Sequence, residues 1–361
     1  MRKYYDDADV VDVFSPSIWA GWYSGVYTNF KEALEDSRKK YPRFLHMEYG
    51  GSSHVGRHDE NPVDGKGMQI EGGWEESVNQ VRVKNIAQSG DWSESYIVDL
   101  FDWHLQVSEQ LDWFTGNAQW AVKDFGTPLR PENPIPYMNQ KGLFDRAGNP
   151  KDAYYVFKSY WTRDTKHDPF VYIESHTWTE RQGPEGQRRN VCVYSNCEAV
   201  ELNLNGISLG KKEWDISQFP ACGLNWDLIF TEGENTLIAK GFRNEKEVFA
   251  DTLTVTYRYE KNGKPEKFDI TYSECMDGNL IVTATARDKN GRRCLDYNDR
   301  VYFYHAGDGK LLINQGTPTG SSIIEMANGQ ASVTLKPSPG GSCTIEARNQ
   351  DFKGDYLEIE F

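Results

Sequence analysis

The sequence predicts an α/β region followed by two all-β domains. Over residues 1–166, apolar runs with strand character alternate with amphipathic segments, an order typical of parallel strands joined by helical crossovers. From residue 167 onward, short segments of alternating apolar and polar residues dominate, and turn signals such as Asn205-Gly206 separate them. These segments fill two regions, 167–260 and 264–361, each close to the roughly 100 residues of an immunoglobulin-like β-sandwich. In the first of these regions the expected strands cover 170–178, 188–195, 199–206, 235–242 and 251–259.

The α/β region contains three strand-helix units in order. Its expected strands cover 10–15, 43–51 and 115–126, and its expected helices cover 29–42, 73–90, 95–111 and 151–162. In the helix at 29–42, Phe30, Ala33 and Leu34 share one face, and Pro42 is the expected stop. Three such units cannot close an eight-stranded barrel, and as an independent domain they would form only a partial α/β layer.

Charge and hydropathy narrow the classes of partner. The formal net charge of −14 argues against a nucleic acid partner, because phosphate binding needs a basic face. No stretch approaches the roughly 18 uninterrupted apolar residues of a membrane helix, so no membrane partner is expected. Aromatic residues make up 13% of the chain, which suits both sugar binding and β-rich cores.

The six cysteines begin at Cys192 and show no zinc-like spacing, and we expect buried free thiols and no metal site or cofactor. Cys192 and Cys197 are close in sequence, but alternation places them on opposite faces of one strand, which disfavours a disulfide. The first residues lack the apolar core of a secretory signal peptide.

The segment from Arg43 to Gly51 carries the central functional candidate. Glu48 lies at the carboxyl end of an apolar strand, the end that forms the active-site face in α/β barrels. Gly50 and Gly51 follow and allow the backbone to turn sharply. A solvated carboxylate at a strand end is the alternative interpretation.

This segment resembles the nucleophile strand of glycoside hydrolase family 2, the group of β-galactosidases, β-glucuronidases and β-mannosidases. The Gly21-Trp22-Tyr23 run and the strand ending near Trp120 resemble neighbouring barrel strands of that family. The segment 139–161, with Lys141-Gly142, Arg146 and Pro150-Lys151, is the most specific similarity. Residues 307–337 resemble the C-terminal immunoglobulin-like domain of bacterial members. The resemblance implies that residues 1–166 are the last three strand-helix units of a (β/α)8 TIM barrel.

The resemblance also implies a retaining mechanism of β-galactosidase type on a galactoside-type glycan. In this mechanism one carboxylate attacks the sugar while a second carboxylic acid protonates the leaving group. Glu48 is the implied nucleophile, and we expect hydrogen-bond donors such as Tyr49 around it. The family places its acid/base in an Asn-Glu pair on an earlier strand, and no Asn-Glu precedes Glu48 in this sequence. We therefore expect a C-terminal piece that lacks the acid/base, with the missing N-terminal half as a possible partner.

Several residues near the implied strand ends are candidate substrate contacts. They are Trp22, Tyr23, Tyr49, His54, Trp120, Lys123, Asp124 and Lys141. A place in the core is the alternative for the aromatic residues, and a structural ion pair is the alternative for Lys123 and Asp124.

Two further functions stay open from the sequence. The chain could be a catalytically inactive truncation, or a carbohydrate-binding or spacer protein built on its sandwiches. Localisation is not predicted, although family members of this build are often periplasmic or secreted in bacteria.

Overall fold

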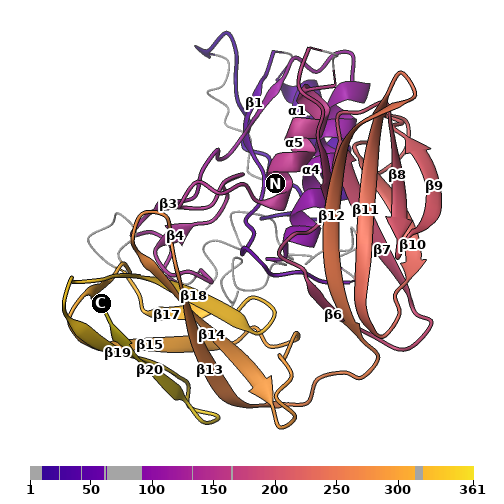
Figure 1. Ribbon diagram of the computed structural model, residues 1–361. Helices are drawn as coiled ribbons and strands as arrows, with labels where there is room; N and C mark the ends of the chain where they lie inside the picture. Colours follow the sequence, from indigo (N-terminus) through magenta and orange to yellow (C-terminus); the bar gives the residue numbers. More distant parts are fainter. Residues whose placement is uncertain are drawn as a thin grey trace. The chain divides into compact units, whose positions relative to one another are not determined.

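A computed structural model describes residues 10–23, 25–41, 43–60, 62, 92–131, 133–163, 166–313 and 320–361. It is mostly β, with few helices among these residues (Figure 1). The chain divides into two compact units, each described here by itself. The first comprises 1–124, 141–180 and 185–257, and the second comprises 125–140, 181–184 and 258–361.

The α/β part of the first unit is built around two parallel strands. They are β1 (His46–Tyr49) and β2 (Asn117–Gln119), and the helix α4 (Glu94–Gln110) lies between them in sequence. Helix α1 (Phe30–Lys40) precedes β1 and follows the short 3-10 helix η2 (Tyr27–Asn29), and helix α5 (Asp152–Trp161) closes this part. The helices expected at 29–42, 95–111 and 151–162 are thus confirmed. The expected helix at 73–90 lies outside the described residues.

Local chemistry explains where these helices begin and which faces they bury. The Ser93 hydroxyl accepts a hydrogen bond from the Tyr96 backbone N–H at 3.0 Å and so caps the start of α4. Helix α1 buries Phe30, Ala33 and Leu34, the apolar face predicted from their spacing.

Two expected strands differ in the structure. Instead of a strand at 10–15, a single parallel bridge joins Phe14 to Phe44. Val10, Val11 and Val13 are exposed, so this apolar run is not buried within the described chain. The run expected at 115–126 is divided, because β2 ends at Gln119 and β3 (Phe125–Gly126) instead pairs antiparallel with β4 (Met138–Asn139) in the second unit.

The first unit also contains two antiparallel sheets, which lie in the region predicted as the first sandwich (167–260). One has the order β10-β7-β5 and the other the order β6-β12-β11-β8-β9. Their bounds are β5 (Val171–Ile173), β6 (Glu180–Gln182), β7 (Arg188–Ser195), β8 (Ala199–Leu204), β9 (Ile207–Glu213), β10 (Gly223–Ile229), β11 (Gly233–Arg243) and β12 (Lys246–Arg258). The alternation that predicted β7, β8, β11 and β12 is seen as alternating burial, for example along β11.

The second unit contains two four-stranded sheets. Their orders are β13-β14-β18-β16 and β17-β15-β19-β20. Figure 1 labels all of these strands except β16. Their bounds are β13 (Pro265–Glu274), β14 (Leu280–Asp288), β15 (Arg300–Gly307), β16 (Lys310–Leu311), β17 (Ile323–Glu325), β18 (Gln330–Lys336), β19 (Ser342–Arg348) and β20 (Asp355–Glu360). Residues from both sheets, including Val282, Phe303, Val333 and Ile345, share one apolar core. This arrangement is a β-sandwich.

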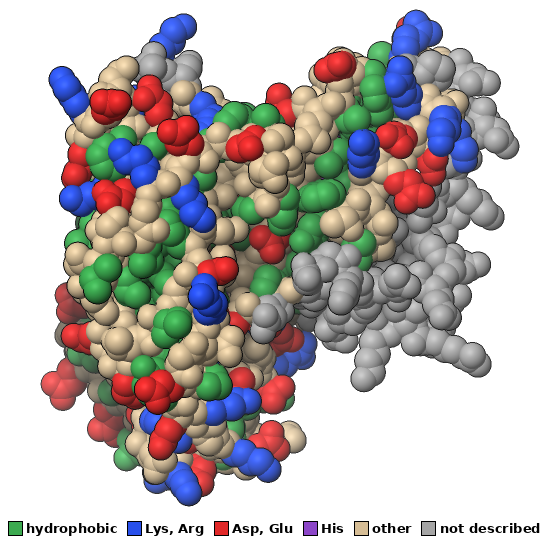
Figure 2. Space-filling model, turned by 90° about the vertical axis from the view of Figure 1, so that its right-hand side faces the viewer, with side chains coloured by type: hydrophobic (Ala, Val, Ile, Leu, Met, Phe, Trp, Pro, Cys, Tyr) green, Lys and Arg blue, Asp and Glu red, His purple; other side chains and the backbone are tan. Residues whose placement is uncertain are grey.

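All six cysteines are free thiols, and five of them are buried as predicted, whereas Cys275 is partly exposed. On the face drawn in Figure 2, acidic and basic side chains are interspersed among exposed hydrophobic ones. Among the described residues, no helix combines the length and apolarity that crossing a membrane requires.

Candidate active site

Strand β1 presents Glu48 at its carboxyl end. Along the strand His46 and Tyr49 are buried, whereas Met47 and Glu48 are exposed. The Tyr49 ring is only 1% exposed and packs against Phe30, Phe101 and His104 from helices α1 and α4. Burial raises the pKa of the Tyr49 hydroxyl above its ordinary value. Tyr49 therefore anchors the strand in the core while Glu48 remains accessible.

The two glycines after Tyr49 are required by different constraints. Gly50 has a φ of +134°, a conformation that side chains rarely adopt. A Cβ atom on Gly51 would lie 2.7 Å from Cδ1 of Ile97 and 2.9 Å from Cε3 of Trp22. Glycine is therefore favoured at both positions, at Gly50 by the backbone conformation and at Gly51 by the close packing of Ile97 and Trp22.

Trp120 lies beside the end of β1. It follows directly after β2, and its backbone N–H donates to the Tyr49 carbonyl at 2.9 Å. Its side chain is 43% exposed, unlike most tryptophans of this unit. Glu48 and Trp120 are therefore carried by the same ends of two neighbouring parallel strands.

Lys141 and Tyr23 form a buried pair. The Lys141 Nζ donates to the Tyr23 hydroxyl at 2.7 Å, and the Lys141 residue is only 5% exposed. The same ammonium lies 5.4 Å from the Trp19 ring, 5.6 Å from the Trp22 ring and 4.8 Å from the Tyr23 ring. Attraction to these ring faces stabilises a cation away from water.

The Lys141 backbone places this pair near the strand ends. The Lys141 carbonyl accepts from the Ala121 N–H and from the Gln119 side chain, both at 2.9 Å. Three predicted contacts, Trp22, Tyr23 and Lys141, are thus brought together.

The remaining predicted contacts have other surroundings. Asp124 is buried, forms an ion pair with Lys151 at 2.9 Å and accepts from the Gly142 N–H at 2.7 Å. Burial raises the Asp124 pKa to about 6, although Lys151 and these hydrogen bonds oppose the shift. Lys123 is exposed beside it. His54 is buried, and its backbone N–H donates to the Trp92 carbonyl at 2.8 Å.

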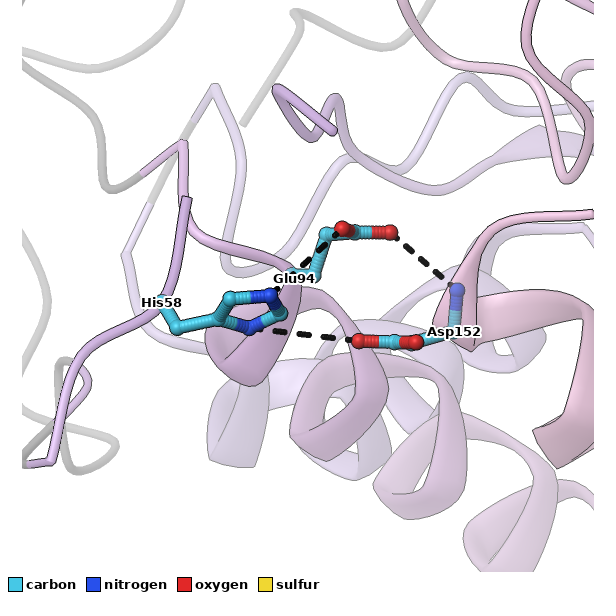
Figure 3. A group of neighbouring side chains, drawn as sticks. All are labelled: His58, Glu94 and Asp152. Carbon is cyan, nitrogen blue, oxygen red and sulfur yellow. Dashed lines mark hydrogen bonds and ion pairs between the residues drawn. The ribbon is translucent and has the colours of Figure 1, made fainter. Parts of the chain in front are cut away.

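A buried cluster that sequence reasoning missed lies in the loop after Glu48. His58 meets Glu94, the first residue of α4, and Asp152, the first residue of α5 (Figure 3). Burial, together with the mutual repulsion of the two carboxylates, raises the pKa of Glu94, and burial raises the pKa of Asp152. The place of each carboxylate in the first turn of a helix was visible in the sequence, but their meeting depends on the tertiary fold.

The chain is similar to a family model and to several named proteins. A family described as "Domain of unknown function (DUF4982)" matches residues 186–249. A Formosa agariphila protein, named as an inferred β-glucuronidase, is 59% identical over 361 residues, which is 100% of this chain and 43% of that protein. A Bacteroides fragilis protein named β-glucuronidase is 26% identical over 246 residues, covering 67% of this chain and 31% of that protein.

Two solved structures similar to this chain are also of β-glucuronidases. The crystal structure of the Parabacteroides merdae β-glucuronidase has a TM-score of 0.82 and 40% identity, covering 98% of this chain and 42% of that one. The Bacteroides uniformis β-glucuronidase 3 has a TM-score of 0.82 and 38% identity, with coverage of 98% and 43%. The chain therefore spans less than half the length of these relatives.

The fold and the relatives define a protein of the glycoside hydrolase class. The chain belongs to glycoside hydrolase family 2, and its matches are consistent with the C-terminal region of such enzymes.

Proposed function

We propose that this chain provides the nucleophile side of the active site of a retaining β-glycosidase that acts on β-glucuronides. The placement of Glu48 carries the proposal: an accessible carboxylate ends a parallel strand, beside the half-exposed Trp120. The parallel β1-α4-β2 unit fits the last part of a (β/α)8 barrel, in which this strand end is the catalytic face.

In the proposed reaction, Glu48 attacks the anomeric carbon and forms a glycosyl-enzyme ester, which water then hydrolyses. The acid that protonates the leaving oxygen lies about 5 Å from the nucleophile in retaining enzymes. We propose that residues outside this chain supply that acid. Trp120 would offer its ring to the apolar face of the sugar.

The choice of glucuronide over the galactoside expected from the sequence rests on the relatives and on Lys141. Relatives named β-glucuronidase outnumber those named β-galactosidase, although both names occur. A glucuronide carries a carboxylate at its C6 position, and Lys141 is a cation held near the strand ends by Tyr23. An ammonium recognises a carboxylate through a charge-assisted hydrogen bond.

Activated substrates test this proposal without the missing acid. A dinitrophenyl leaving group departs without protonation, so we expect slow hydrolysis of dinitrophenyl β-glucuronide and much slower hydrolysis of the β-galactoside. Glu48→Gln should abolish the reaction, whereas Glu35→Gln on the exposed face of α1 should leave it unchanged. Equal rates for the two sugars would refute the glucuronide preference, and a rate that survives Glu48→Gln would refute the nucleophile.

A second candidate function, glycan binding, is favoured by the second unit. Tyr304 on β15 and Tyr356 on β20 are 54% and 65% exposed, and both are in register with Glu346 on the strand between them. The guanidinium of Arg348 lies 5.7 Å from the Tyr304 ring. Two exposed rings and two charged groups on one sheet face suit the apolar faces and hydroxyls of a sugar chain.

Affinity electrophoresis in gels containing acidic or neutral polysaccharides tests the second candidate. Retardation that Tyr304→Ala and Tyr356→Ala remove, and that Tyr272→Ala on β13 retains, would support it. Unchanged mobility in every gel would exclude it.

A further inference from the structure

The cluster of His58, Glu94 and Asp152 joins three separate segments of the first unit. Each side chain is almost completely buried, with relative exposures of 0–3%. The His58 Nε2 lies 3.9 Å from the Glu94 Oε2, and the His58 Nδ1 lies 4.0 Å from the Asp152 Oδ2 (Figure 3). Lys151, the residue before Asp152, forms an ion pair with Asp124 at 2.9 Å, and its charge also lowers the pKa of Glu94.

Hydrogen bonds around the cluster fix the direction of its protons. The Ser175 hydroxyl donates to the Asp152 Oδ1 at 2.9 Å, so it can only accept from the Thr177 hydroxyl, 3.0 Å away. Because the Thr177 hydroxyl hydrogen points to Ser175, its oxygen accepts a hydrogen bond from the His58 Nε2–H at 2.7 Å. The Nε2 atom therefore carries the proton, and in a neutral ring the Nδ1 atom presents a lone pair.

In this arrangement the His58 Nδ1 and the Asp152 Oδ2 are both hydrogen-bond acceptors, and they face each other at 4.0 Å. The Asp152 Oδ2 accepts no hydrogen bond from the described residues, although it is buried. Its separation of 4.0 Å from the His58 Nδ1 is too long for a hydrogen bond. It is close to twice the roughly 2.0–2.2 Å at which imidazole nitrogen and carboxylate oxygen bind zinc.

We propose that His58, Glu94 and Asp152 bind one divalent transition-metal ion, Zn²⁺ or Mn²⁺, through the His58 Nδ1, the Glu94 Oε2 and the Asp152 Oδ2. One imidazole with two carboxylates suits both ions. A divalent ion would displace any proton from the two carboxylates and balance their charge, since a buried anion is costly without a counter-charge.

The surroundings match those of a structural metal ligand. A histidine that binds a metal usually donates its other N–H to an acceptor that orients the ring, as His58 does to Thr177. The Trp178 ring stacks on His58 at 5.0 Å and further restricts its orientation. In tetrahedral coordination the ligand atoms would lie about 3.4 Å apart, so small side-chain movements would complete the site.

The ion would fasten the loop after Glu48 to the first turns of α4 and α5. The Glu94 carboxylate already accepts from the Gly56 N–H at 2.8 Å and from the Asp152 N–H at 3.1 Å. Removing the ion should loosen this loop, and the loop begins two residues after the proposed nucleophile.

Metal content and stability test the proposal on the full chain. We expect about one equivalent of zinc or manganese by mass spectrometry of protein purified without chelator. EDTA should lower the melting temperature, and Zn²⁺ or Mn²⁺ should restore it. Replacement by Co²⁺ should give the visible absorption bands of nitrogen and oxygen ligands, a readout independent of activity.

Variants separate binding from folding. Asp152→Asn, which removes a ligand charge, should weaken metal binding well over 10-fold, and Thr177→Val, which keeps all three ligands, should weaken it about 10-fold. Asp124→Asn, a matched buried carboxylate paired with Lys151, should keep the full metal content. If Asp152→Asn fails to fold, the metal affinity of Thr177→Val and the cobalt spectrum of the wild type still test the metal site.

The competing arrangement is a protonated His58 that balances the carboxylates by itself. A wild-type chain without stoichiometric metal, whose melting temperature ignores Zn²⁺, Mn²⁺ and EDTA, would overturn the metal site. Equal metal content in the wild type and in Asp152→Asn would also overturn it.

Discussion

The side chains at the strand ends differ in their exposure to solvent. Glu48 and Trp120 are accessible, whereas Tyr49, Trp22, Tyr23 and Lys141 are buried around them. A motif could identify Glu48, because the glycines and the strand are local features of the sequence. Burial of the other candidates could not be predicted, because it depends on helices α1, α4 and α5 packing against the strands.

Gly51 gives a prediction at this scale. Gly51→Ala should displace Trp22 or Ile97, because the new Cβ would lie within 2.9 Å of both, and should destabilise the protein by about 1–3 kcal/mol. Intrinsic fluorescence and chemical denaturation would detect this change. Ser52→Ala, at the adjacent buried position, is the control and should change little. An unaltered Gly51→Ala protein would show that the turn has more room than the structure indicates.

At the scale of elements, the helices could be predicted better than the strands of the first sandwich. The expected helix at 29–42 and the strand at 188–195 are found because burial follows their sequence period. Strand β9 was missed because nearly all its residues are exposed, which leaves no alternation to detect. Strand β10 was also missed, and a carboxylate distant in sequence binds the backbone at its start.

That carboxylate is Asp102, which links α4 to β10. It accepts from the backbone N–H groups of Ala221, Cys222 and Gly223 at 2.7–3.1 Å. Asp102→Ala should leave these buried donors without a partner and cost about 3 kcal/mol. Urea denaturation would measure the loss, with Glu109→Ala on the exposed face of the same helix as the control. A loss no greater than that of the control would contradict this role.

Asp288, at the end of β14, predicts how stability depends on pH. Burial raises its pKa, but hydrogen bonds from the backbone of Gly263, Arg292 and Asn290 and from the Arg292 guanidinium lower it to about 2. Its unfolded value is the ordinary 3.8. Because the unfolded chain binds the proton first, this contribution is complete above the unfolded value and is lost as the pH falls towards 2.

The corresponding measurement compares melting temperatures of the wild type and Asp288→Asn from pH 7 to pH 2. The variant should be less stable at pH 7, and the difference should shrink as the pH falls from about 4 to 2. Asp351→Asn, at an exposed position of the same unit, should track the wild type throughout. A difference that stays constant down to pH 2 would contradict the lowered pKa.

At the scale of the whole molecule, the first sandwich and the α/β part form one compact unit. Asp102 binds the chain at 221–223, and the Tyr172 hydroxyl donates to Asp152 at 2.6 Å. Sequence composition changes near residue 167, and the boundaries predicted there, 1–166 and 167–260, stay predictions. Sequence composition indicates whether a region is α/β or all-β, but it does not indicate which surfaces pack together.

These links predict that residues 1–166 and 167–361, produced as two chains in one cell, will copurify. Residues 1–166 alone should be insoluble, because the surface that packs on the sandwich would be exposed. Asp102→Ala should weaken copurification, and Glu109→Ala should not. A soluble, monomeric 1–166 would show that the two parts are independent.

The central claim, that Glu48 is a nucleophile toward β-glucuronides, is tested most directly by trapping its ester. A dinitrophenyl 2-deoxy-2-fluoro-β-glucuronide slows breakdown of the ester and needs no acid for its formation. Mass spectrometry of the digested chain should find one added fluorosugar on the peptide containing Glu48, and none in Glu48→Gln. Labelling of another carboxylate, or no labelling of a folded chain at any concentration, would contradict the claim.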